Sequence, residues 1–239
     1  DAVARVGAVL LRELPGVGAR LLDHPGVAVF FWPRTPGFSS LEHPLVQTVC
    51  RYGATGSSCP NDMQIQPGSW VPLPWGDVRA VTLAACVGKP RGVGRIRFDT
   101  SRPLDPPVIE TALLANPDDR RMATEALRKI GELARTPILS KLARPVYPSR
   151  HPWDDAGAFV APPEQICGSG YHPSGTAPMG PERDPLAVTD AHGRVRGTRG
   201  LYVADASLMP TITSSNTHLP TLMIGERFGE WLRAIDDRA

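Results

Sequence analysis

The sequence contains only 4 cysteines among 239 residues, and no two of them form a Cys-x-x-Cys pair. Structural zinc sites draw their ligands from closely spaced Cys and His residues, so the sequence predicts no metal site. A disulfide between Cys50 and Cys59 is one possibility. A chain of this size can nevertheless bury a sufficient core without cross-links, which favours free thiols in a reducing compartment.

Charge of one sign and long apolar runs are also scarce. The 26 Lys and Arg residues exceed the 24 Asp and Glu residues by a net charge of +2 and are scattered, so no nucleic-acid partner is predicted. The longest apolar candidate, residues 78–88, contains Arg79 and is about half as long as a membrane span. These features favour a cytoplasmic protein, with peripheral membrane attachment as the alternative.

The sequence has no G-x-G-x-x-G turn. Dinucleotide-binding folds place this turn between a strand and a helix, where it holds the pyrophosphate. Gly16-Val17-Gly18 does not follow a strand, and Gly92-Val93-Gly94 lies between two apolar runs instead of preceding a helix. Any dinucleotide site on this chain is therefore expected to be incomplete.

Hydrophobic residues make up 41% of the sequence and alternate with 26 Pro and 23 Gly residues, which predicts a folded, loop-rich chain. Apolar runs predict strands at 27–32, 78–87 and 92–98, the last two as an antiparallel pair. Apolar residues at helical spacing predict a helix over 118–142, started by Asn116-Pro117.

The ends of the chain carry three further predicted elements. Residues 2–14 read as a short helix, and residues 200–204 have the pattern of a short buried strand. Pro220 is a natural first helical position, so a last helix is expected from there. Its apolar face is expected to comprise Ile224, Phe228, Trp231, Leu232 and Ile235.

Chemically active residues gather in the loops around these last elements. His172 lies in a Gly- and Pro-rich loop, where an imidazole can exchange protons near neutral pH or simply cap a backbone group. Asn216 and His218 are two positions apart and project to the same side of an extended backbone. They precede a helix start, which suits a developing anion but is also an ordinary place for capping. Asp205, at a strand end, points either to a ligand crevice or to a turn.

Taken together, these segments resemble the C-terminal signature of the glucose-methanol-choline (GMC) family of flavin oxidoreductases. The resemblance is carried by HPSGTAPMG, DPLAV, GLYVADASLMP and NTHLPT, at 172–180, 184–188, 200–210 and 216–221. Upstream, LPGVGARLLDHP (14–25) and PRGVGRIRFDTSRPLDPPVI (90–109) are similar to further family segments.

The resemblance implies an α/β fold: an α+β substrate domain with an antiparallel sheet, plus the C-terminal part of a Rossmann-like FAD-binding domain. Residues 1–26 would end the FAD-binding part, residues 27–160 would form the substrate-binding domain, and residues 161–239 would carry the catalytic loops and return to the FAD-binding domain. The implied cofactor is FAD.

The resemblance also implies roles for single residues. His172 would accept the hydroxyl proton while the substrate carbon gives a hydride to the flavin. His218 would orient the alcohol, and Asn216 takes this second role if the pairing slips by two. His24 is interpreted as structural, with a role near the flavin as the alternative. The residues implied to contact FAD are Asp205 and Ala206, near the phosphate or ribityl region, and Pro220 and Thr221, near the flavin ring.

The implied activity is FAD-dependent oxidation of a primary or secondary alcohol. The tail is most similar to the family branch associated with mycofactocin, which implies a redox cofactor as electron acceptor. Because the resemblance covers the C-terminal half of such enzymes, the missing N-terminal FAD-binding half is expected as a partner, and the fragment is expected to be inactive alone. The alternatives are a non-redox cyanohydrin lyase on the same scaffold and a catalytically dead fragment.

Overall fold

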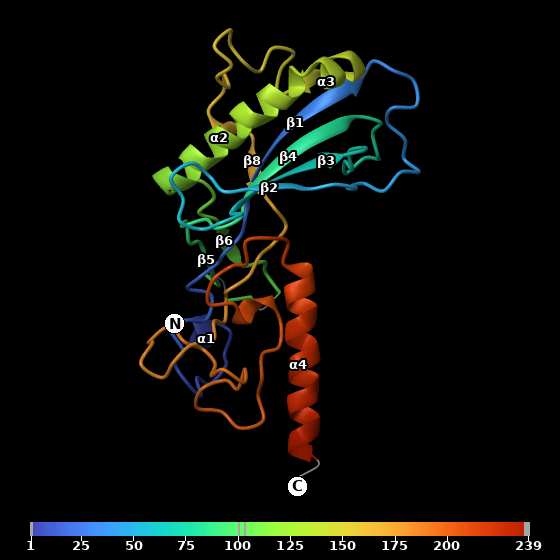
Figure 1. The fold of residues 1–239 in the computed structure, drawn as a ribbon. Coiled ribbons are helices and arrows are strands. Elements are labelled where there is room, and N and C mark those ends of the chain that lie inside the picture. The colour runs from blue at the N-terminus through green and yellow to red at the C-terminus, as the bar shows by residue number, and fades with distance from the viewer. Residues whose placement is uncertain (1, 100, 103, 237–239) are drawn as a thin grey trace. The chain divides into compact units, whose positions relative to one another are not determined.

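The computed structural model describes residues 2–99, 101–102 and 104–236 (Figure 1). The chain divides into two compact units, each built from segments that are distant in sequence. Unit 1 comprises Asp1–Asp23, Gly92–Ala112 and Tyr171–Ala239, and unit 2 comprises His24–Arg91 and Leu113–Gly170.

Unit 2 is an antiparallel sheet. Its path runs β2-β3-β4-β1-β7, and β8 pairs with β1 beside β7. The central strand β1 alternates strictly, with Val27, Val29 and Phe31 buried, as expected for a sheet with one face on a core. The strand bounds are β1 Pro25–Pro33, β2 Cys50–Tyr52, β3 Met63–Gly68, β4 Val81–Val87, β7 Ala143–Tyr147 and β8 Cys167–Ser169.

The helix α2 (Pro117–Ala134) covers one face of this sheet and contacts β1, β3 and β4 (Figure 1). Asn116 caps it, because the Asn116 side chain accepts a hydrogen bond from the Asp118 N–H at 2.9 Å. Leu127 and Ile130 on its inner face are fully buried. The core of unit 2 therefore lies between α2 and the sheet.

Replacing Leu127 with alanine should lower the free energy of unfolding of unit 2 by about 2–5 kcal/mol, because the lost side chain leaves a cavity under the helix. Leu133 on the same helix is 41% exposed, so Leu133→Ala is the matched control and should cost less than ~1 kcal/mol. Urea unfolding of the full chain, followed by circular dichroism, measures both. Equal losses in the two variants would contradict this placement of the core.

The predicted strand at 27–32 and the helix beginning at Asn116-Pro117 are confirmed as β1 and α2. The predicted helical region 118–142 forms two helices instead of one. Thr136 caps the second, α3 (Pro137–Leu142), whose first residue is a proline and has no N–H to donate. In the same unit, the short turn η1 (Pro163–Gln165) precedes β8.

The predicted antiparallel pair of 78–87 with 92–98 is wrong. Both edges of β4 are already paired, with β1 and β3, so β4 has no free edge to offer. The second run forms β5 (Arg95–Arg97), which pairs with β6 (Val108–Glu110) in unit 1.

Unit 1 has little regular structure: α1 (Ala2–Arg5), the β5–β6 pair, the turn η2 (Ala206–Leu208) and α4 (His218–Asp236). The predicted helix over 2–14 is wrong in length. It stops at Arg5 because Gly7 adopts a positive φ of 71°, a typical helix terminator.

Two predictions near the C-terminus are corrected. Residues 200–204 form no strand, since their pairing in the described part of the chain is one bridge, Arg194 to Tyr202, and Leu201 is 52% exposed. An apolar run becomes a strand only where neighbouring strands offer hydrogen bonds. The last helix begins at His218, two residues before Pro220. On its predicted apolar face Phe228 is buried, while the Ile235 side chain lies outside the described residues.

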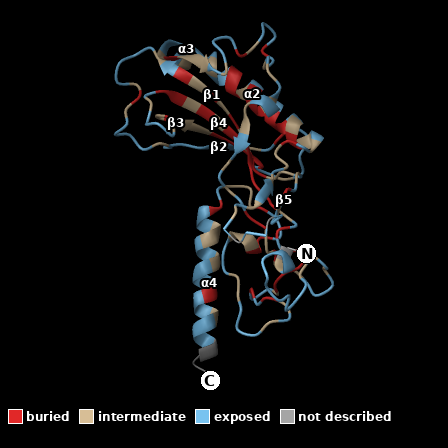
Figure 2. Ribbon diagram, turned by 180° about the vertical axis from the view of Figure 1, so that it is seen from behind, coloured by how far each residue is buried: buried red, intermediate tan, exposed pale blue. Residues whose placement is uncertain are grey.

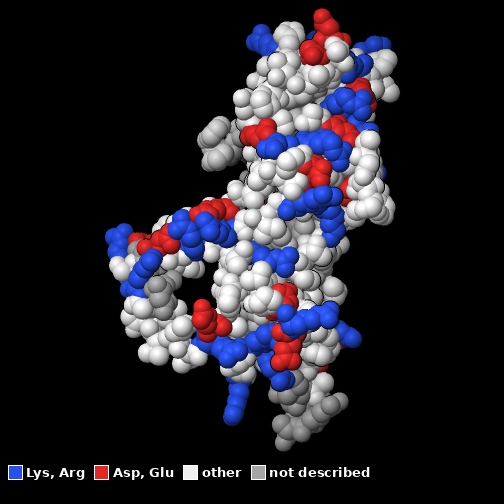
Figure 3. All heavy atoms as spheres, turned by 90° about the vertical axis from the view of Figure 1, so that its left-hand side faces the viewer, with Lys and Arg blue, Asp and Glu red and all other residues white. Residues whose placement is uncertain are grey.

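The surface charges are mixed, with basic and acidic side chains interspersed on the face shown in Figure 3. Several of them pair, such as Arg128 with Glu132 at 2.6 Å. Among the described helices, none combines the length and apolar character required to cross a bilayer. The four cysteines are free thiols, as predicted.

Candidate active site

The loop that carries His172 is held from two sides within unit 1. On one side, Leu22 and Ser174 exchange two backbone hydrogen bonds of 2.9 Å each. On the same side, the Gly18 N–H donates to the Thr176 carbonyl at 2.8 Å. The segment before Asp23 thus pairs with the loop like a short strand.

On the other side, the loop follows the turn η2. The N–H groups of Gly175, Ala177 and Met179 donate to the carbonyls of Ala206, Ser207 and Leu208, respectively, at 3.1, 2.9 and 2.9 Å. This regular series joins segments about thirty residues apart. Loops fixed in this way hold catalytic side chains with little conformational freedom.

Gly175 explains how the two sides approach so closely. Its φ is +76°, and a Cβ at this position would lie 2.9 Å from Leu22 Cδ1 and 3.1 Å from the Met209 carbonyl oxygen. Only glycine combines this backbone conformation with the absence of a side chain. The close packing of the loop against Leu22 and Met209 therefore requires the glycine of the HPSG segment.

The His172 imidazole lies 3.1 Å from the Asn216 amide, measured between Nε2 and Nδ2. An amide nitrogen donates and does not accept, so Nε2 is the acceptor and the proton of the neutral ring is on Nδ1. Burial lowers the pKa of His172, and the negative charge of Asp23 opposes that shift without cancelling it. Burial thus favours the neutral ring, whose Nε2 lone pair is directed at the Asn216 donor.

Asp23 is a site residue that the sequence did not indicate. Its Oδ1 accepts the backbone N–H of His172 at 3.0 Å, and its side chain is buried, with the residue 9% exposed. In sequence, Asp23 looks like part of the DHP turn, and no spacing pattern links it to a position 149 residues later. The neighbouring His24 is fully buried, and its carbonyl accepts the Gly170 N–H at 2.8 Å.

The structure does not bring all predicted residues together. His218, the first residue of α4, is exposed, and its side chain makes no hydrogen bond or ion pair with the described residues. Asp205 caps η2 by accepting from the Ser207 N–H at 2.8 Å and from its hydroxyl at 2.5 Å. Ala206 adjoins the His172 loop through Gly175. Pro220 and Thr221 lie in the first turn of α4, where the Thr221 hydroxyl donates to the Thr217 carbonyl at 2.7 Å.

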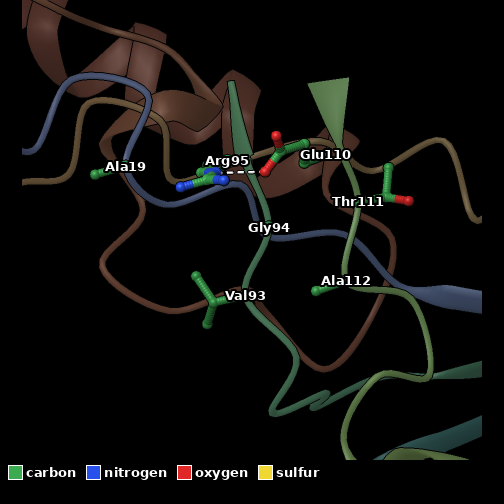
Figure 4. A pocket seen from close by; sticks show the side chains of 7 residues that line it. All are labelled: Ala19, Val93, Gly94, Arg95, Glu110, Thr111 and Ala112. Atoms are coloured by element: carbon green, nitrogen blue, oxygen red, sulfur yellow. Dashed lines mark hydrogen bonds and ion pairs between the residues drawn. The ribbon is translucent and has the colours of Figure 1, made fainter. Parts of the chain in front are cut away.

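A separate cavity of about 350 Å³ in unit 1 contains none of these residues (Figure 4). Arg95 and Glu110 pair across it, and Arg97 also binds Glu110 at 2.9 Å. Hydrogen bonds from Arg95 and Arg97 lower the pKa of Glu110. The charged groups of Arg95, Arg97 and Glu110 are thus paired with one another. The lining residues are Ala19, Val93, Gly94, Arg95, Glu110, Thr111 and Ala112.

Comparison with known proteins gives one family. Residues 90–225 match the model described as GMC oxidoreductase. A 5-(hydroxymethyl)furfural oxidase of Methylovorus sp. (strain MP688) is 30% identical over 246 residues, which cover 94% of this chain and 45% of the oxidase. An alcohol dehydrogenase (acceptor) of Pseudomonas putida is 33% identical over 150 residues, 62% of this chain and 27% of that protein.

Solved structures share the fold. Pyridoxine 4-oxidase from Mesorbium loti superposes with a TM-score of 0.80 and 23% identity over 98% of this chain and 47% of that one. A formate oxidase superposes with a TM-score of 0.81 and 19% identity over 98% of this chain and 50% of that one. The similarity confirms the predicted α/β fold class. The chain spans about half the length of the curated relatives it matches.

Proposed function

The chain belongs to the GMC oxidoreductase family, and on that premise we propose that it supplies the proton acceptor and part of the flavin site for FAD-dependent oxidation of an alcohol. The relatives support this substrate class: besides the two enzymes above, an oxygen-dependent choline dehydrogenase of Stenotrophomonas maltophilia (strain R551-3) is 28% identical over 94% of this chain.

The observation that carries the proposal is the neutral His172 ring with Nε2 as acceptor. A general base must be unprotonated at working pH and within hydrogen-bond reach of the proton it takes. In the proposed reaction the alcohol hydroxyl donates to Nε2, either in place of the Asn216 amide or together with it. The O–H proton then passes to this nitrogen. FAD, when bound, would supply the hydride acceptor for the carbon that bears this hydroxyl.

Asn216 is the neighbour that we propose for the second role, because its amide is already at the imidazole. An amide that donates to Nε2 can turn to donate to the alkoxide oxygen as charge develops there. His218 is two residues further along and exposed. We therefore propose that it contacts the part of a larger substrate that extends beyond the carbinol group.

The residues present fit one end of FAD. Ala206 is hydrogen-bonded to the His172 loop, so a ribityl or phosphate group at Asp205 and Ala206 would lie beside the base. Pro220 has no N–H to donate and the Thr221 N–H already donates to the Thr217 carbonyl at 2.9 Å, so these two residues would favour negative charge on a reduced ring through the dipole at the start of α4. The pyrophosphate turn has no counterpart in the sequence, so this fit covers half of the cofactor.

An N-terminal FAD-binding half is therefore part of the proposal. Unit 1 exposes apolar side chains that such a half would cover. On α4, Leu219, Leu222 and Met223 are 73%, 53% and 60% exposed, and their spacing puts them on one side of the helix; Figure 2 shows most of α4 as exposed. Exposed apolar patches of this kind mark interaction surfaces.

We assign residues 27–160 to substrate binding and residues 1–26 and 161–239 to the flavin side; within the first range, residues 92–112 belong to unit 1. The sheet face turned away from α2 supports this. It presents half-buried side chains of mixed polarity, including Phe30, Thr82 and Gln66, beside a tilted contact of Phe30 with Tyr147. Such a lining suits an organic alcohol. As electron acceptor we propose a redox cofactor such as mycofactocin, and as location the cytoplasm, where free thiols persist.

Anaerobic addition of an alcohol to the protein, loaded with flavin by co-expression with the family's N-terminal half, tests the proposal. Oxidation of the alcohol should bleach the absorbance band of the oxidised flavin at about 450 nm, because the hydride reduces the ring. The matched control is the corresponding methyl ether, which has no hydroxyl proton to give. A panel of alcohols that are consumed without any bleaching would instead identify a non-redox lyase.

A further inference from the structure

Asp23 is a buried carboxylate, and none of the roles proposed so far involves it. The residue is 9% exposed, and its Oδ1 accepts the His172 backbone N–H at 3.0 Å. An acid of this kind is costly to bury unless it performs a compensating interaction. The contact joins the first segment of unit 1 to the loop that carries the proposed base.

The surrounding backbone fixes both partners. Leu22, next to Asp23, is locked to Ser174 by two hydrogen bonds, and Gly175 leaves no room between Leu22 and Met209. Neither Asp23 nor His172 can therefore move along the chain direction without breaking this ladder. The carboxylate is held at a fixed place on the His172 backbone N–H, from where its charge acts on the imidazole.

We propose that Asp23 is a positioning residue for the proton transfer, holding the His172 backbone and stabilising the imidazolium that forms; this rests on the proposed function of His172. In that step the O–H bond of the alcohol breaks and an Nε2–H bond forms, so the ring gains one positive charge. A fixed carboxylate lowers the free energy of that cation. The residue acts through His172 and needs no contact with substrate.

Of the other ionisable groups on the packed segments, His24 is fully buried next to Asp23 in the chain. Three more are engaged elsewhere or exposed. Arg20 donates to the Pro210 carbonyl at 2.8 Å, Asp205 accepts from Ser207, and His218 is exposed on α4. For His172 the named electrostatic influence is Asp23, which raises its pKa against the larger lowering by burial. Removing the Asp23 charge should therefore make the imidazole a weaker base.

The test is Asp23→Asn, which keeps an oxygen to accept the His172 N–H and removes the charge. The matched control is Asp77→Asn, an exposed acid in unit 2. Titration of the His172 ring by NMR in the full chain, assigned with His172→Gln, should give a lower pKa in Asp23→Asn than in the unsubstituted protein, and no change in Asp77→Asn. Circular dichroism checks that each variant folds.

In the flavin-loaded enzyme, kcat/KM should rise with pH as His172 loses its proton, and this acid limb should move to lower pH in Asp23→Asn. The plateau should fall by about tenfold, less than the roughly 10²–10⁴-fold contribution of a general base itself, because the base remains and the substituted side chain still accepts its backbone N–H. Asp23→Ala, which also loses the backbone acceptor, should fall further, by about a hundredfold.

Different outcomes overturn the positioning role of Asp23 and the proposed function of His172 as the base. An unchanged His172 pKa in a folded Asp23→Asn variant overturns the positioning role, whatever the activity of His172 variants. A lowered His172 pKa with an unmoved activity profile supports the electrostatic coupling but overturns His172 as the base, and with it the proposed function.

Discussion

Replacing His172 with alanine is expected to reduce turnover of the flavin-loaded enzyme by about 10²–10⁴-fold, the usual contribution of a general base, while bound FAD stays at its normal level. The reason is that the imidazole is the neutral acceptor of this loop, whereas the loop itself is held by backbone hydrogen bonds and by Gly175. Loss of the ring should leave that backbone in place. The measurement is steady-state turnover beside the flavin absorbance per protein.

The matched control is His151→Ala. His151 is exposed in unit 2 and should change neither turnover nor FAD content. If His172→Ala retains full turnover, the assignment of the base is wrong. If it loses flavin together with activity, His172 supports the cofactor site instead of the proton transfer.

The second large effect concerns the cofactor. The 239-residue chain expressed alone is expected to contain little or no bound FAD, because it carries the residues that we propose for the ring end of the site but no G-x-G-x-x-G turn for the pyrophosphate. The phosphate contacts supply much of the anchoring of a dinucleotide in such folds. Absorbance of the purified chain after incubation with excess FAD and gel filtration measures the occupancy.

Co-expression with a polypeptide that supplies the family's N-terminal half should restore yellow protein, and the control is the same co-expression with Leu219, Leu222 and Met223 changed to Asp. These side chains are exposed in the chain alone, so the changes should weaken association without unfolding unit 1. A stoichiometric flavin content in the isolated chain would refute the half-site argument.

The sequence predicted those elements that depend on local patterns. Strand β1 alternates with a period of two, and α2 carries apolar residues at helical spacing behind an Asn-Pro cap; both signals are complete within their own segments. It failed where pairing decides the outcome. The run at 92–98 could have paired with 78–87, but β4 uses both edges within unit 2. Residues 200–204 are mostly apolar, yet in the described part of the chain their pairing is the single bridge of Tyr202 with Arg194, made by backbone hydrogen bonds of Leu201 and Val203.

The sequence by itself determined the family, and it supplied the prediction of a catalytic loop with His172, since both depend on contiguous motifs such as HPSGTAPMG. Only the tertiary structure decided which side chains meet that histidine. It places the Asn216 amide at Nε2 and a buried Asp23 at the backbone N–H. The physical reason is that motifs encode local conformation, whereas these contacts depend on hydrogen bonds between segments up to 149 positions apart, which no local period specifies.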